Sequence, residues 1–156
     1  MKKLLTLFII LQFSCVISLA QNTAKNKQIA SRYFEEVINQ QKVELIPQLF
    51  AQEFVYYDLH DFSETKDKVS SFQEVMRGFF KAFPDAHYTV KNMIAESDKV
   101  SAEIIVTGTH KGEFMGIPAT NKPLKVSETY LFVIKNGKIS ESRRLVDFAA
   151  FFEQIK

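Results

Sequence analysis

The chain has 156 residues, and its 20 Lys and Arg nearly balance its 18 Asp and Glu. This length fits one domain with a substantial hydrophobic core. No polybasic tract lies outside the first residues, which argues against nucleic acid as a partner, because phosphate binding depends on clustered positive charge.

The first 20 residues are typical of an export signal. Lys2 and Lys3 precede an apolar run over residues 4–17, and the small residues of Ser18-Leu19-Ala20 suit a signal peptidase. We therefore predict a signal peptide over residues 1–20 and a mature domain over residues 21–156, located in the periplasm or outside the cell. Cleavage would leave 18 basic and 18 acidic residues, and hence no net charge.

Two other uses of this segment are weaker alternatives. Gln12 and Ser14 interrupt the apolar run, which argues against a retained membrane span. A lipid anchor at Cys15, the single cysteine, is disfavoured because Phe13-Ser14 make a poor lipoprotein signal. We expect no membrane partner after cleavage. A mature chain without cysteine must take its stability from its core.

Helical spacing of apolar residues marks the first half of the chain. It predicts an amphipathic helix over residues 25–40, and another that begins at Ser70 or Ser71 and stops before Pro84. Between these helices we predict a short irregular helix over residues 43–50, a strand over residues 53–58 and a polar loop over residues 59–68.

The apolar period changes to two from Ala86 onward. This period predicts strands over residues 87–95, 99–109, 122–134 and 138–146, followed by a last helix over residues 148–155. Helices followed by a strand meander predict an α+β fold, in which the helices pack on one face of a curved antiparallel sheet that closes a cone over them.

Three stretches carry a resemblance to a known family. They are Phe83-Pro84-Asp85, Asn136-Gly137-Lys138-Ile139 with Glu141, and Gly108-Thr109-His110-Lys111-Gly112-Glu113-Phe114-Met115-Gly116-Ile117-Pro118. With this order of elements, residues 25–156 resemble the SnoaL-like polyketide or ester cyclases of the nuclear transport factor two-like superfamily. The resemblance implies a cone-shaped α+β barrel, usually a homodimer, with a small-molecule pocket in its mouth and no metal or organic cofactor. In the founding cyclases an acidic pocket residue moves protons during an intramolecular aldol ring closure.

The chain departs from the family pattern at specific positions. Ser142 and Arg143 stand where the family commonly has His and Trp after the glutamate, and Tyr57 takes the place of a common His near the end of the first strand. Asp147 is the counterpart of the family's acidic residue before the final helix. The resemblance therefore implies Asp147 as an acid and Tyr57 as a substrate-binding residue, and it leaves the aromatic polyketide reaction itself open.

Alternation on the strand over residues 122–134 places one carboxylate among core side chains. Glu128 shares its face with Leu124, Val126, Tyr130 and Phe132. Burial would raise the pKa of Glu128 and suit it to general acid or base catalysis, with Tyr130 beside it as a substrate-binding residue. The alternative is that Glu128 lies near the sheet rim or pairs with an arginine.

Alternation on the next strand places Arg143 on one face with Ile139, Glu141, Leu145 and Asp147. We therefore predict that Arg143 and Asp147 line one cavity with Glu128, where Arg143 could orient a ligand carboxylate or enolate oxygen. A structural ion pair between neighbouring strands is the alternative reading of Arg143.

Four further positions, one tyrosine and three histidines, are candidates for a role in the site. Tyr57 is a candidate ligand contact or an ordinary core tyrosine, and His110 is a candidate ligand contact or, preferably, a structural histidine of the long loop. His60 and His87 have no partner at metal-ligand spacing, so we expect surface positions and no metal site.

Two functions from different classes remain open. The first is a secreted enzyme without a cofactor, which performs cyclisation, isomerisation or ester or lactone chemistry on a small apolar or amphipathic molecule. The second is a non-catalytic binding module on the same cone, because a fold alone does not determine a function.

Overall fold

The computed structural model describes residues 22–58 and 64–156, so the predicted signal peptide and His60 lie outside the described residues. Residues 22–32 form an α-helix that continues into the π-helix η1 (Tyr33–Ile38). The later elements are the 3-10 helix η2 (Val43–Leu45), α2 (Ile46–Leu49), β1 (Phe50–Asp58), β2 (Glu64–Lys68), α3 (Val69–Ala82), β3 (His87–Glu96), β4 (Lys99–Thr109), β5 (Pro123–Lys135), β6 (Lys138–Val146) and α4 (Phe148–Ile155).

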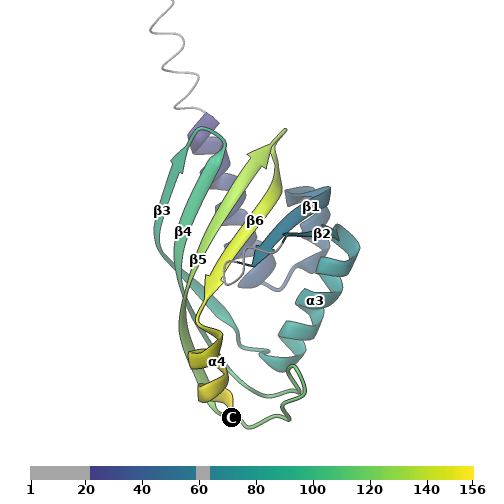
Figure 1. Ribbon diagram of the computed structural model, residues 1–156, viewed down its shortest axis with the longest axis vertical. Helices are drawn as coiled ribbons and strands as arrows, with labels where there is room; N and C mark the ends of the chain where they lie inside the picture. Colours follow the sequence, from purple (N-terminus) through teal and green to yellow (C-terminus); the bar gives the residue numbers. More distant parts are fainter. Residues whose placement is uncertain (1–21, 59–63) are drawn as a thin grey trace, which may run out of the picture.

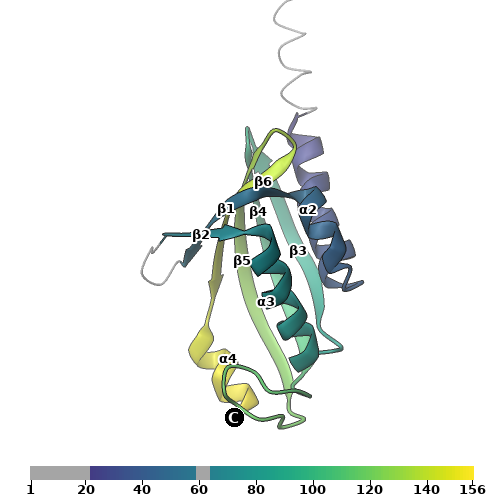
Figure 2. The ribbon, with the colours of Figure 1, turned by 90° about the vertical axis from the view of Figure 1, so that its right-hand side faces the viewer.

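Six strands of the described chain form one curved sheet in the order β2-β1-β6-β5-β4-β3 (Figure 1). Strands β3 to β6 form the expected antiparallel meander, whereas β1 lies parallel to β6. The N-terminal helix, α2 and α3 cover one face of the sheet, and α4 follows β6 and lies beside the first residues of β5 (Figure 2). The predicted α+β class, with helices on one face of a curved sheet, is confirmed.

The predicted polar loop over residues 59–68 is wrong in its second half. Residues Glu64–Lys68 form β2, which pairs antiparallel with β1 at the sheet edge. The sequence of β2, ETKDK, is charged and lacks apolar alternation, so the apolar period could not reveal it. Charged residues suit an edge strand because they discourage pairing with a further chain.

Aromatic rings from the N-terminal helix and β5 form the centre of the core. Phe34 is fully buried, with its ring centroid 5.3 Å from that of Tyr130 and 5.8 Å from that of Phe132. Tyr33 is also buried, and its ring lies 5.7 Å from Phe132 in an edge-on arrangement. These contacts fix the helix over the concave face of the sheet, because buried aromatic pairs add to the stabilisation that comes from burial alone.

A β-bulge in β6 changes which of its side chains face the core. Ile134 pairs with Ile139, but the preceding residue of β5, Val133, pairs with Glu141, so Ser140 is an extra residue in β6. Ile139 is fully buried, and after the bulge the inward positions are 142, 144 and 146. The bulge therefore reverses the alternation that would have placed Arg143 inside.

The Phe-Pro-Asp turn follows α3, and its aspartate is hydrogen-bonded to the end of β4. The Asp85 carboxylate accepts hydrogen bonds from the Thr109 backbone N–H at 2.7 Å and from the Thr109 hydroxyl at 2.6 Å. The hydrogen bond from the hydroxyl holds the pKa of Asp85 below its usual value. Asp85 is thus a structural anchor, and it positions the start of the loop that follows β4.

The long loop after β4 folds back against the end of α3. The backbone N–H groups of Lys111 and Gly112 both donate to the Ala82 carbonyl, at 2.8 Å and 3.1 Å. A Cβ atom on Gly112 would lie 2.5 Å from the Lys81 carbonyl oxygen, so only glycine permits this approach. The loop then places Phe114 against Phe79 and Phe83.

Candidate functional site

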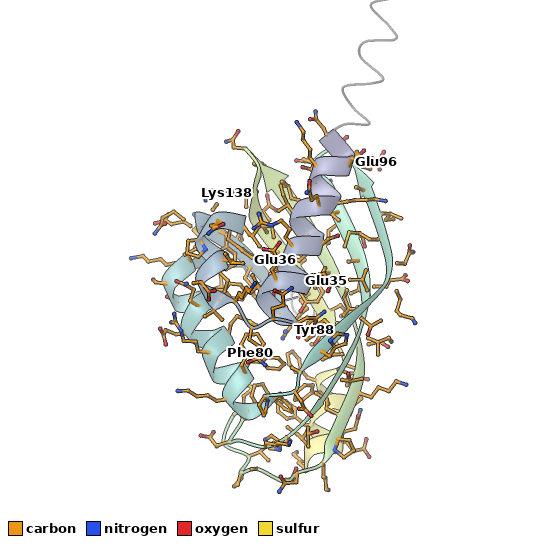
Figure 3. All side chains as sticks on the ribbon, turned by 180° about the vertical axis from the view of Figure 1, so that it is seen from behind. Glu35, Glu36, Phe80, Tyr88, Glu96 and Lys138 are labelled. Carbon is orange, nitrogen blue, oxygen red and sulfur yellow. The ribbon has the colours of Figure 1, made fainter. Side chains whose placement is uncertain are left out.

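A pocket of about 330 Å³ lies between the concave face of the sheet, the N-terminal helix, α3 and the loop after β4. Figure 3 shows Tyr88 on β3 and Phe80 on α3 in the interior between the helices and the sheet, whereas Glu96 lies at the far end of β3. Most of the pocket wall is apolar or aromatic. The residues that line it are Tyr33, Phe54, Tyr56, Phe72, Val75, Met76, Phe79, Tyr88, Phe114, Tyr130, Ser142 and Arg144.

Glu128 lies directly behind this wall and is only 5% exposed. The Tyr130 hydroxyl donates a hydrogen bond of 2.8 Å to Glu128 Oε2, and Tyr130 itself lines the pocket. Burial raises the pKa of Glu128, while the Arg144 guanidinium and the Tyr130 hydroxyl each offset part of that rise. The buried carboxylate is thus connected to the pocket through one phenol.

Tyr130 and its neighbour Tyr88 are neutral hydroxyl groups at ordinary pH. Burial raises the pKa of each well above its usual value, and the nearby Glu128 charge raises both further. A neutral phenol can donate one hydrogen bond and accept another. Tyr130 can therefore receive a hydrogen bond from the pocket side while it donates to Glu128.

Arg144 brings a positive charge to the pocket. It is the register partner of Tyr130 across the β5–β6 pairing, and the bulge at Ser140 turns it toward the concave face. Its Cζ lies 5.7 Å from the centroid of the Phe148 ring, and its Nε is buried without a hydrogen-bond partner among the described residues. An arginine stays protonated, so this charge persists at any ordinary pH.

The prediction that Arg143 and Asp147 line one cavity with Glu128 is wrong for both residues. Arg143 lies on the other face of β6, where its Cζ is 4.3 Å from the Tyr57 ring centroid and its Nη2 is 3.6 Å from Glu141 Oε2. Asp147 is exposed and accepts a hydrogen bond of 2.9 Å from the Ala150 backbone N–H as the N-cap of α4. The bulge accounts for Arg143, and the capping role accounts for Asp147.

The two remaining candidates lie outside the pocket wall. Tyr57 faces away from the pocket beneath Arg143, and its neighbour Tyr56 lines the pocket instead. His110 is fully buried, 3.1 Å from the Thr120 hydroxyl through Nδ1 and stacked on Phe83 at 5.3 Å. Its Nε2 is buried without a hydrogen-bond partner among the described residues, and His110 is not among the residues that line the pocket. His87 is exposed, as expected.

Sequence reasoning missed several pocket residues. Arg144 was missed because strict alternation assigned the inward position to Arg143. Tyr88 and Tyr56 fit the alternation of their strands, but the sequence carries no mark that separates a pocket tyrosine from a core tyrosine. The described residues include no group of three His, Cys, Asp or Glu that could hold a metal ion. None of the helices in the described part is long and apolar enough to cross a membrane.

Replacing Asp147 with Ala is expected to destabilise the protein by about 1 kcal/mol, because the first turn of α4 would lose its side-chain cap. Asp147→Ser is the matched control, since a serine hydroxyl can accept the same hydrogen bond. Chemical denaturation of the three proteins measures the difference. Equal stability of Asp147→Ala and the unmodified protein would contradict the capping role.

One family model matches most of the chain, and solved structures share its fold. The family model of the SnoaL-like polyketide cyclases matches residues 28–155 of this chain. A crystal structure from Jannaschia sp. CCS1, assigned as a SnoaL-like polyketide cyclase, has a TM-score of 0.77 and 22% identity over 85% of this chain and 92% of its own. An assigned polyketide cyclase from Acidithiobacillus ferrooxidans has a TM-score of 0.74 and 22% identity over 84% and 94% of the two chains.

A third similar structure bears another assignment. AclR from Streptomyces galilaeus, assigned as a hydroxylase, has a TM-score of 0.70 and 26% identity over 81% of this chain and 77% of its own. No protein with a curated description matches the chain. Because the family model spans most of the sequence, including every residue of the pocket, the chain belongs to the SnoaL-like polyketide cyclase family.

Proposed function

We propose that the protein is a small-molecule enzyme that needs no cofactor and performs proton transfer in the pocket. The observation that carries the proposal is the hydrogen bond of 2.8 Å between Tyr130, which lines the pocket, and the buried Glu128. The family's fold supports cyclase or isomerase chemistry on a small molecule.

The proposed step abstracts a proton from a carbon next to a carbonyl group. The substrate proton moves to Tyr130 Oη as the Tyr130 hydroxyl proton moves to Glu128 Oε2, and the electron pair of the C–H bond becomes the enolate. Tyr130 stays neutral throughout, in keeping with its high pKa. The positive potential of Arg144 favours the anionic enolate.

The fate of the enolate decides the overall reaction. Attack of the enolate carbon on a second carbonyl group of the same molecule forms a carbon–carbon bond and closes a ring, and the resulting alkoxide takes the proton back from Glu128 through Tyr130. Return of the proton from Glu128 through Tyr130 to a different carbon completes an isomerisation. Both outcomes use the same two residues, because the enolate is common to both.

The proposal can be tested without the natural substrate. The enzyme should accelerate deuterium incorporation into the acidic positions of 2-tetralone, a ketone with two fused rings, as measured by ¹H NMR in deuterated buffer. Exchange no faster than in buffer with bovine serum albumin, for this and other bicyclic ketones, would contradict it.

A binding module is the second candidate function. The mostly apolar and aromatic wall favours it, since no carboxylate is among the described residues that line the pocket. Saturable binding of bicyclic ketones without any accelerated exchange would support this function.

We also propose that the protein is exported and that signal peptidase cleaves it after Ala20. Lys2-Lys3, the apolar run and Ser18-Leu19-Ala20 support this. Mass spectrometry of the exported protein should find Gln21 at the N-terminus, and a chain that retains Met1 or begins at a lipidated Cys15 would exclude it.

We further propose a homodimer formed through the outer face of the sheet. Ile94 is 62% exposed and Leu145 is 47% exposed, and the half-buried Ile105 and Leu131 lie on the same outward face. Apolar side chains on both faces of a sheet need a cover besides the chain's own helices. Light scattering at micromolar concentration should give twice the monomer mass, and Leu145→Lys should lower it, whereas a monomer mass for the unmodified protein would contradict the dimer.

A further inference from the structure

One formal charge lies in the described part of the pocket wall. Among the described residues that line the pocket, Arg144 alone is charged, and the wall also includes side chains from α3 and β1. A lone cation in such a wall is costly unless a ligand or a neighbouring group compensates it. Its position is therefore informative about what the pocket accepts.

The guanidinium group of Arg144 has a donor that a ligand could use. Its Nε is buried and unpartnered, and no ion pair within 4.0 Å joins it to a carboxylate among the described side chains. The charge of Arg144 offsets part of the rise in the pKa of Glu128, but the hydrogen bond that Glu128 Oε2 accepts comes from the Tyr130 hydroxyl. Arg143, one residue away, has the same buried Nε but uses its guanidinium on the outer face, over Tyr57 and near Glu141.

The remaining wall restricts the body of the ligand. Phe54, Phe72, Phe79 and Phe114 present ring faces and edges, and a volume of about 330 Å³ is at the small end of ligand pockets. Such a space suits one or two fused rings or a short alkyl chain. The planar fork of a guanidinium matches a carboxylate through two parallel hydrogen bonds.

We infer that the pocket binds small amphipathic carboxylic acids, with the carboxylate on Arg144 and the apolar body against the phenylalanines of α3 and β1. This names a substrate class for the reaction proposed above and rests on that proposal only for the chemistry that follows binding. The carboxylate fixes the molecule at β6, so the carbon that reacts lies on the Tyr130 side of the pocket.

Isothermal titration calorimetry with two probes tests the inference. The unmodified protein should bind 2-naphthoate about 10- to 100-fold more tightly than the neutral 2-naphthamide, the usual contribution of a charged hydrogen-bonded pair. Arg144→Met should abolish that preference and leave the amide affinity unchanged, whereas the matched Arg143→Met should retain the preference. Equal binding of both probes to the unmodified protein, no binding of naphthoate, or the same loss in Arg143→Met would overturn the inference.

These experiments distinguish a failure of the binding inference from a failure of the proposed function. Naphthoate binding that depends on Arg144, together with unchanged ketone exchange in Glu128→Gln, would refute the proposed function and support the inference. Exchange that depends on Glu128, together with equal binding of naphthoate and naphthamide, would do the reverse. If Arg144→Met does not fold, the comparison of the two probes on the unmodified protein still decides the question.

Discussion

Glu128→Gln is expected to lower the rate of proton transfer by about 10²-fold or more, the usual contribution of a general base. The glutamine side chain has the same shape and its oxygen can still accept the Tyr130 hydroxyl, but it cannot take the proton that the relay delivers. Tyr130→Phe should cause a similar loss, because it removes the group that connects Glu128 to the pocket. Deuterium exchange into 2-tetralone measures both variants.

The matched control for Glu128→Gln is Asp147→Asn. Asp147 caps α4 from an exposed position, and an asparagine oxygen can accept the same hydrogen bond from Ala150. Asp147→Asn should therefore keep the full rate and nearly full stability. Full activity in Glu128→Gln, or an equal loss in both variants, would contradict the assignment of Glu128 as the base.

The rate should also depend on pH in a defined direction. Proton abstraction needs the ionised Glu128, and burial raises its pKa above the ordinary value of 4.5. The rate should therefore fall as pH decreases through that raised pKa, so the acid limb should lie above pH 4.5. Glu128→Gln should remove this limb from the residual rate.

Phe34→Ala is expected to lower the free energy of unfolding by about 4 kcal/mol, the usual cost of truncating a buried phenylalanine. Phe34 is fully buried, and its ring contacts Tyr33, Tyr88, Tyr130 and Phe132, so its loss would leave a cavity at the centre of the core. Chemical denaturation followed by circular dichroism measures the change.

Val75→Ala provides the control for Phe34→Ala. Val75 is 62% exposed, although it lies at the pocket wall, so its truncation should change the stability by less than about 0.5 kcal/mol. If Phe34→Ala lowers the free energy of unfolding no more than Val75→Ala does, the N-terminal helix is not packed on the sheet through Phe34.

The sequence predicted the elements around the pocket where one period holds throughout. The β4–β5 pairing is continuous from Lys99 to Thr109, so alternation correctly put Glu128 and Tyr130 on the buried face. The prediction failed on β6, because one extra residue at Ser140 exchanges the two faces of the strand. Nothing in the local composition marks that bulge.

The acidic residue before the last helix illustrates a different limit. Asp147 precedes the helical segment of α4, a position where aspartate commonly caps the first turn. The family resemblance favours a proton-transfer role for Asp147, whereas its position before the helix indicates a cap. In contrast, the Phe-Pro-Asp turn and the glycine-containing loop are recognisable in the sequence. Their hydrogen bonds to Thr109 and Ala82 join residues far apart along the chain, so no local pattern predicts them.

The central claim is that Tyr130 and Glu128 form one proton-transfer pair. The most direct test of this claim is a measurement of the pKa of the Glu128 carboxyl group. It can be followed by ¹³C NMR of protein with labelled glutamate carboxyl groups, with the Glu128 signal assigned by its loss in Glu128→Gln. We predict a pKa above the ordinary 4.5 that rises further in Tyr130→Phe, because the hydroxyl stabilises the carboxylate. A Glu128 that titrates at its ordinary value and does not respond to Tyr130→Phe would contradict the account.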